Sequence, residues 1–196
     1  SAREALAIGK QLGNKVILMG TSTGGTLALM LAANYASNVH SLILLSPNIA
    51  IKDGAAVLLN NHWGLQIARM VKGSNYVDAK DQRDIYKKYW YSRYRLEGAV
   101  ALQEMLETSM TPQTFEKITQ PTLMLYYYKD EVHQDSVVSV KAMLQMFEKL
   151  GTSTADKKAV AIPSAGDHVI GSWIKSKDVA AVEKEIDLFL RKLINP

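Results

Sequence analysis

Residues 20–24 place a serine between two glycines, in the order Gly-Thr-Ser-Thr-Gly, which is the pattern G-x-S-x-G. The apolar run Lys15–Met19 comes before it, and an Ala- and Leu-rich segment, 26–35, comes after it. These neighbours predict a buried strand and a helix, so the serine falls on a strand-to-helix turn. This context favours Ser22 as a catalytic nucleophile over the alternative, a glycine-rich connection with an incidental serine.

The spacing of the two glycines has a physical reason. A turn this sharp forces the serine into a strained backbone conformation, and we expect neighbouring backbone to leave no room for side chains at Gly20 and Gly24. The hydroxyl of Ser22 would then stand clear at the N-terminus of the helix. There the backbone N–H of Thr23 is expected to point at developing negative charge, as a donor of an oxyanion hole.

A serine hydroxyl needs a base, and four histidines are available. His168 follows the apolar run 158–162, at the carboxyl end of a predicted strand, and is the favoured base. The alternative, His133, lies just past another predicted strand and could equally be a surface loop residue. The other two histidines are His40, which precedes a strand, and His62, which lies outside the strand pattern.

The base in turn needs a carboxylate that orients it and stabilises its charged form. Asp130 is the first acid after the apolar run 121–128, so the sheet should fix its position best. Glu131 and Asp135 are nearby rivals. Asp167, next to the favoured histidine, is expected to be a solvated loop residue.

The elements around these residues alternate between short apolar strands and amphipathic helices. This pattern predicts a parallel sheet covered by helices on both faces, in which ligands bind beyond the carboxyl ends of the strands. The expected strands are 15–19, 41–45, 121–128 and 158–162, and the expected helices are 1–12, 26–35, 136–150 and 177–193.

Three separated segments together resemble the serine α/β-hydrolases of the esterase and lipase type. They read VILMGTSTGGTLAL, PTLMLYYYKDEV and PSAGDH, and the resemblance covers nearly the whole chain outside 51–113. It implies the α/β-hydrolase fold with Ser22 as nucleophile, Asp130 as acid and His168 as base. One departure is Tyr128, because many members have a small residue two positions before the acid.

The resemblance also implies a division of the chain. Residues 1–50 and 114–196 would form the hydrolase core, and 51–113 would be a helical cap inserted over the active site. Within that insertion, the aromatic and basic run Tyr86–Arg95 has the spacing of a cap helix that packs on the core, in preference to a surface on which nucleic acid stacks. Three methionines could line an apolar substrate site or simply fill a core: Met70, Met105 and Met110.

Members of this family have about four strands before the nucleophile strand, whereas here 21 residues precede Ser22 and predict one helix. We therefore expect an N-terminal polypeptide segment to complete the sheet and to supply the second oxyanion donor. Without that segment, the strand at Lys15–Met19 would be an exposed edge.

Composition bounds the remaining possibilities. The chain has 196 residues, 47% of them hydrophobic and 21% charged, with a net charge of +4 and no cysteine. This balance is that of a globular domain, leaves no apolar run long enough for a membrane span, and excludes disulfides and thiolate chemistry. We expect no cofactor, no metal and no nucleic acid, with a small-molecule carboxylic ester as substrate. The alternatives are an acyltransferase or thioesterase on the same triad, and a non-catalytic binding module or inactive fragment.

Overall fold

The computed structural model describes residues 2–194, except for the side chain of Ala55, and its internal contacts divide the chain into two units. Unit 1 comprises Ser1–Lys52 and Ser109–Pro196, and unit 2 is Asp53–Thr108. The insertion expected from the sequence was 51–113. The role of unit 2 as a cap stays a prediction.

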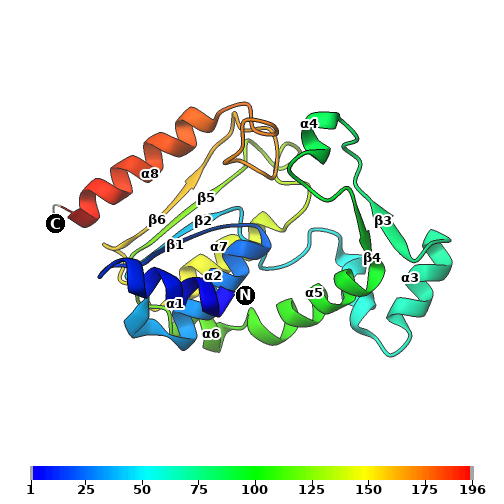
Figure 1. Cartoon of the computed structure of the whole chain (residues 1–196), viewed down its shortest axis with the longest axis horizontal. Helices are drawn as coiled ribbons and strands as arrows, with labels where there is room; N and C mark the ends of the chain where they lie inside the picture. The colour runs from blue at the N-terminus through cyan, green and yellow to red at the C-terminus, as the bar shows by residue number, and fades with distance from the viewer. Residues whose placement is uncertain (1, 195–196) are drawn as a thin grey trace. The chain divides into compact units, whose positions relative to one another are not determined.

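Unit 1 is built on a parallel sheet with the strand order β1-β2-β5-β6 (Figure 1). This sheet confirms the expected α/β class. Its strands are β1 (Ile17–Thr21), β2 (Ser41–Leu45), β5 (Thr122–Tyr126) and β6 (Lys157–Ala161). Its helices are α1 (Ala2–Leu12), α2 (Thr23–Asn34), α6 (Pro112–Glu116), α7 (Val140–Lys149) and α8 (Val179–Ile194), with a 3-10 turn η1 (Ala36–Asn38).

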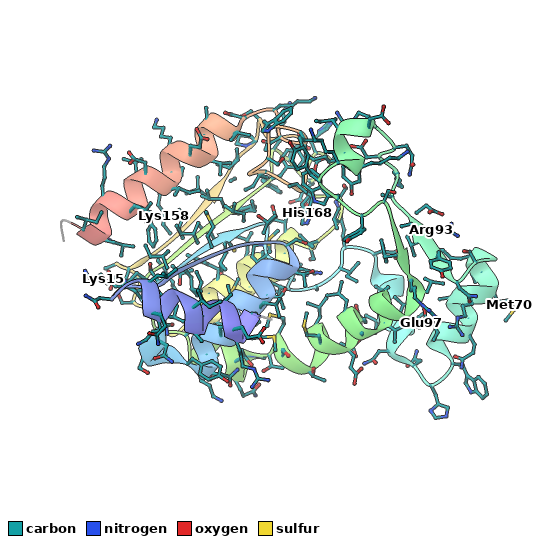
Figure 2. All side chains as sticks on the ribbon, in the orientation of Figure 1. Lys15, Met70, Arg93, Glu97, Lys158 and His168 are labelled. Carbon is teal, nitrogen blue, oxygen red and sulfur yellow. The ribbon has the colours of Figure 1, made fainter. Side chains whose placement is uncertain are left out.

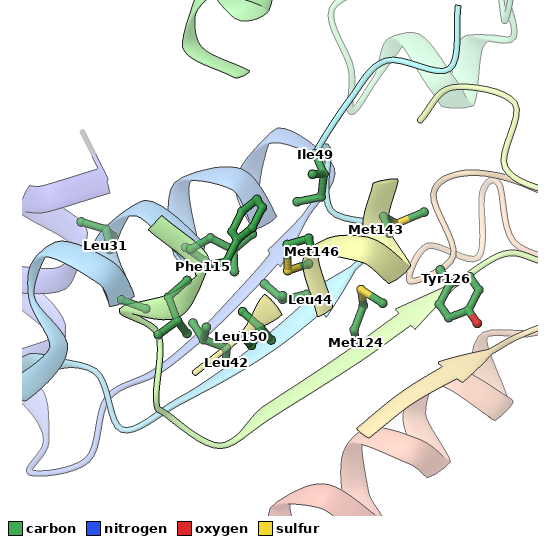
Figure 3. Packing of buried hydrophobic residues seen from close by; sticks show 14 of the residues in the cluster. Leu31, Leu42, Leu44, Ile49, Phe115, Met124, Tyr126, Met143, Met146 and Leu150 are labelled. Carbon is green, nitrogen blue, oxygen red and sulfur yellow. The ribbon is translucent and has the colours of Figure 1, made fainter. Parts of the chain in front are cut away.

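Side chains of the central strands alternate between two apolar clusters, one on each face of the sheet. Leu44 and Met124 belong to the cluster shared with α2 and α7 (Figure 3). Leu45 and Leu125 belong to the second cluster, which α8 covers with residues such as Phe189. Both faces of the central strands are therefore covered, which explains their uninterrupted apolar sequences.

The first strand lies two residues later than the sequence predicted, because β1 runs from Ile17 to Thr21 and pairs Thr21 with Leu45 of β2. It is the edge strand of the sheet formed by the described residues, as expected. Ile17 is 39% exposed and Met19 61% exposed, unlike the buried side chains of β2. The apolar sequence of β1 is therefore only partly covered.

Unit 2 combines helices with an antiparallel strand pair that the sequence did not predict. The expected cap helix over Tyr86–Arg95 is wrong: helix persists for one turn, and residues 93–95 then form a strand. Cross-strand contacts explain the difference, because Arg93 lies over the ring of Tyr76, 4.4 Å from its centroid. The elements of unit 2 are η2 (Gly54–Asn60), α3 (Gly64–Lys72), β3 (Tyr76–Asp78), α4 (Asp84–Lys87), β4 (Arg93–Arg95) and α5 (Leu96–Ser109).

Candidate active site

Ser22 lies between β1 and α2 in a strained backbone conformation, with φ 54° and ψ −122°. Main-chain hydrogen bonds hold it on both sides. Its N–H donates to the carbonyl of Leu45, 3.0 Å away, and its own carbonyl accepts from the N–H of Gly25 at 2.9 Å. The strand-to-helix turn predicted from the sequence is therefore present, with the serine at its apex.

The glycines of this turn differ in what they do. A Cβ at Gly20 would lie 2.4 Å from the carbonyl carbon of Gly24, so no side chain fits there, as predicted. The expectation for Gly24 is wrong, because a Cβ at that position would meet open space. The second crowded position is Gly25, where a Cβ would lie 2.8 Å from the Cβ of Pro47. The loop after β2 therefore packs closely against the first turn of α2.

His168 lies in the loop after β6 and pairs with a buried carboxylate. Its Nδ1 is 2.6 Å from Oδ2 of Asp135, and both side chains are buried. An ionised carboxylate can only accept a hydrogen bond, so Nδ1 carries a proton, and in the neutral imidazole Nε2 is then the acceptor. That Nε2 atom is buried and has no hydrogen-bond partner among the described residues. The histidine is thus oriented with a basic nitrogen available for a proton.

The carboxylate of Asp135 is itself fixed by the main chain that follows it. Its Oδ1 accepts from the N–H groups of Val137, at 2.8 Å, and Val138, at 3.0 Å. The backbone N–H of Asp135 donates to the carbonyl of Tyr127, just past the end of β5. Both carboxylate oxygens therefore have defined partners, and the position of the imidazole follows from them.

The structure corrects the predicted pairing of His168 with Asp130. Asp130 lies on an exposed loop, where its carboxylate accepts from the N–H of Val132 and contacts Nδ1 of His133 at 2.9 Å. The hydrogen bond from the backbone N–H of His133, more than the contact with its ring, lowers the pKa of the Asp130 carboxyl. A bridge between Tyr128 and Gln134 closes this loop. Asp135, which follows this loop, is therefore the acid that lies beside the end of β5.

Ser22, Asp135 and His168 follow β1, β5 and β6 respectively, so parallel strands deliver all three to the same end of the sheet. In Figure 2, His168 lies at the end of the sheet opposite Lys15 and Lys158. Thr23 is the first residue of α2, and its N–H is one of those that a helix start leaves without an intrahelical partner. The candidate nucleophile, base, acid and oxyanion donor thus come from segments of unit 1 at one end of the sheet.

One cavity among the described residues does not belong to this constellation. It has a volume of about 620 Å³ and lies between α1 and the later turns of α2, where Met30 and Tyr35 line it. These residues are at the opposite end of α2 from Ser22. We therefore assign this cavity no part in the chemistry.

Residues 2–194 contain neither a metal-binding cluster nor a membrane-spanning helix. No group of three or more His, Cys, Asp or Glu side chains there could hold a metal ion. Within the same residues, no helix combines the length and apolar character that crossing a bilayer requires.

The fold and the arrangement of the site define a class, the α/β-hydrolases. The chain belongs to the family described as serine aminopeptidase, S33, whose model matches residues 4–168. A comparison with curated protein sequences found no match.

Solved structures of lipases and esterases share this fold. A structure from work on LipS and LipT, two metagenome-derived lipolytic enzymes, has a TM-score of 0.75 at 12% identity and covers 97% of this chain and 70% of its own. The monoacylglycerol lipase of Paleococcus ferrophilus has a TM-score of 0.70 at 18% identity, over 98% of this chain and 76% of that one. A soluble variant of monoglyceride lipase from Saccharomyces cerevisiae gives 0.68 at 14%, over 97% and 69%. At these identities the likeness shows the fold alone.

Proposed function

We propose that this protein is a serine hydrolase that cleaves carboxylic esters through an acyl-enzyme on Ser22. The observation that carries the proposal is the buried pair of Asp135 and His168, 2.6 Å apart, with Nε2 of the histidine unpaired among the described residues. A buried, oriented imidazole with one free acceptor is what a serine nucleophile requires. The acid in this proposal is Asp135, in place of Asp130.

The reaction would proceed in two halves. Nε2 of His168 removes the proton from Oγ of Ser22 as that oxygen attacks the acyl carbonyl, and the N–H of Thr23 stabilises the oxyanion. The tetrahedral intermediate collapses, and the alcohol leaves with the proton from His168. Water then attacks the acyl-enzyme, with the same imidazole as base, and releases the carboxylic acid. Asp135 holds the ring and stabilises its charged form throughout.

The second oxyanion donor is proposed to come from a polypeptide segment that pairs with the open edge of β1. The exposure of Met19 and Ile17 on that edge supports this proposal. An uncovered apolar edge strand favours pairing with another chain segment. Loss of one oxyanion donor typically lowers turnover about 100- to 1000-fold, so full activity is expected only when this edge is occupied.

Esters are proposed because lipases and esterases are among the structures that share the fold. The family name points to a second reaction, removal of N-terminal amino acids from peptides, and the same triad could also serve acyl transfer or thioester hydrolysis. A nitrophenyl ester and an aminoacyl nitroanilide, assayed side by side, separate the first two reactions. We expect hydrolysis of the ester to be the faster.

The test of the nucleophile is Ser22→Ala, assayed with a nitrophenyl ester and with a fluorophosphonate, which forms a P–O bond to an activated serine as fluoride leaves. We expect both hydrolysis and labelling to disappear, because the acyl and phosphonyl groups are proposed to attach to Oγ of Ser22, which the substitution removes. Ser153→Ala, at an exposed serine, is the matched control and should keep both. Labelling that survives in Ser22→Ala, or a wild-type protein that neither labels nor hydrolyses, would contradict the proposal and favour a non-catalytic module.

A further inference from the structure

The loop after β2 contacts the nucleophile turn through a buried residue that is not part of the proposed triad. The hydroxyl of Thr26 donates to the carbonyl of Asn48 across 2.6 Å, and both side chains are buried. The two residues are 22 positions apart in the sequence, so this bond joins separate segments. It links the first turn of α2 to the chain that leaves β2.

Asn48 in turn holds Ser22. Its backbone N–H donates to the carbonyl of Ser22 at 3.0 Å, and the backbone N–H of Thr26 reaches the same carbonyl at 3.3 Å. The serine carbonyl is therefore bound from two directions, by its own helix and by the loop after β2. The hydroxyl of Thr26 connects these two supports.

The contact is close because the neighbouring position has no side chain. At Gly25, a Cβ would lie 2.8 Å from the Cβ of Pro47, so the loop could not approach α2 if that residue were larger. Gly25 thus leaves room for the loop to approach α2, and the hydroxyl of Thr26 then binds the loop at Asn48. A positive φ at a non-glycine residue persists only where the surroundings over-determine it, and Ser22 has such a φ.

We infer that Thr26 is a positioning residue for the nucleophile: its hydroxyl, through Asn48, fixes the main chain of Ser22 so that Oγ is held for attack. This inference rests on the proposed function of Ser22, and it adds a residue on which the rate of acylation at Ser22 depends. Thr26 itself is fully buried and is not proposed to touch substrate. Its loss should therefore lower the rate of acylation and leave substrate binding unchanged.

The variant that tests this is Thr26→Val, which keeps the shape of the side chain and removes the hydroxyl. We expect the rate constant of fluorophosphonate labelling and kcat for a nitrophenyl ester to fall about tenfold, because small displacements of a reacting group are costly, with KM within about twofold. Thr26→Ser restores the hydroxyl and should stay within about threefold of the wild-type rate, whereas Thr26→Ala should resemble the valine variant. The serine and alanine pair serves if the valine variant does not fold.

Thr152→Val is the matched control for a purely structural effect. Thr152 is also a buried threonine whose hydroxyl binds main-chain carbonyls, those of Ile118 and Gln120. Its loss should lower the melting temperature without slowing labelling. The inference is overturned if Thr26→Val and Thr26→Ala label at the wild-type rate, or if Thr152→Val slows labelling equally. Failure of the proposed function is a separate result, seen as labelling that persists in Ser22→Ala.

Discussion

Unit 1 and unit 2 are stabilised by different kinds of contact. In unit 1, apolar side chains of the sheet are buried in two clusters, and the polar groups of the candidate site are bound by main-chain atoms. In unit 2, the buried hydrophobic side chains that the structure describes are Leu96 and Leu106. Aromatic and ionic contacts between exposed or half-buried side chains join its elements instead, including Arg69 and Arg95 on Glu97.

This difference supports placing the proposed catalytic site in unit 1. A catalytic group needs surroundings that hold it to a fraction of an ångström, and the buried main-chain network of unit 1 provides them. In unit 2, by contrast, the apolar side chains of Trp63 and Met70 are 64% and 78% exposed. Figure 2 shows Met70 pointing away from α3.

The largest expected difference between the two units is in how far a single substitution lowers the free energy of unfolding. Leu44→Ala, in the fully buried core of unit 1, should lower the free energy of unfolding by about 2–5 kcal/mol, because it removes buried apolar contacts and leaves a cavity. Met70→Ser, at a side chain that is 78% exposed, should change it by less than about 0.5 kcal/mol. Denaturant unfolding of both variants measures the difference. Equal losses would show that Met70 is covered by something outside the described residues.

A smaller expected effect is the pH dependence of an ion pair in unit 2. The hydrogen bond from Arg95, followed by the backbone N–H of Glu97 itself, lowers the pKa of the Glu97 carboxyl to about 2. Because the folded pKa lies below the ordinary value of 4.5, the contribution of this ion pair to stability is fully present above about pH 4.5 and is lost as the pH falls toward 2. An NMR titration should place the midpoint of Glu97 near 2, and Arg95→Gln should raise it. A midpoint near 4.5 in the unchanged protein would show that the pair does not form in solution.

The two units also differ in how far their sequences predict them. The strands of unit 1 follow from apolar runs, since a strand buried on both faces has no polar positions, and β2 was predicted to the residue. The strand pair of unit 2 depends on contacts between Tyr76 and Arg93, which are distant in the sequence and carry no periodic signal. Helical spacing of the aromatic residues was therefore misleading there.

Within the proposed site, Ser22 and His168 could be proposed from local patterns, because Ser22 directly follows β1 and His168 lies in the loop after β6. The proposed acid, Asp135, could not, because position in the sequence favoured Asp130, while the loop between Tyr128 and Gln134 carries Asp130 away from β5. One signal was available: Val137 and Val138 follow Asp135 directly, and an aspartate commonly binds the N–H groups two and three residues ahead. Asp130 binds Val132 and His133 in the same way, so this signal alone could not have decided between them.

The most direct test of the central claim compares Asp135→Asn with Asp130→Asn. Each change keeps the size of the side chain and removes its charge, one at the buried partner of His168 and the other on the exposed loop. With turnover of a nitrophenyl ester as the readout, Asp135→Asn is expected to lower kcat about 10³- to 10⁴-fold, because the imidazole loses its orientation and the stabilisation of its charged form. Asp130→Asn is expected to stay within about twofold of the wild type. A loss of more than a hundredfold in Asp130→Asn, with Asp135→Asn unaffected, would contradict the assignment of Asp135 as the acid.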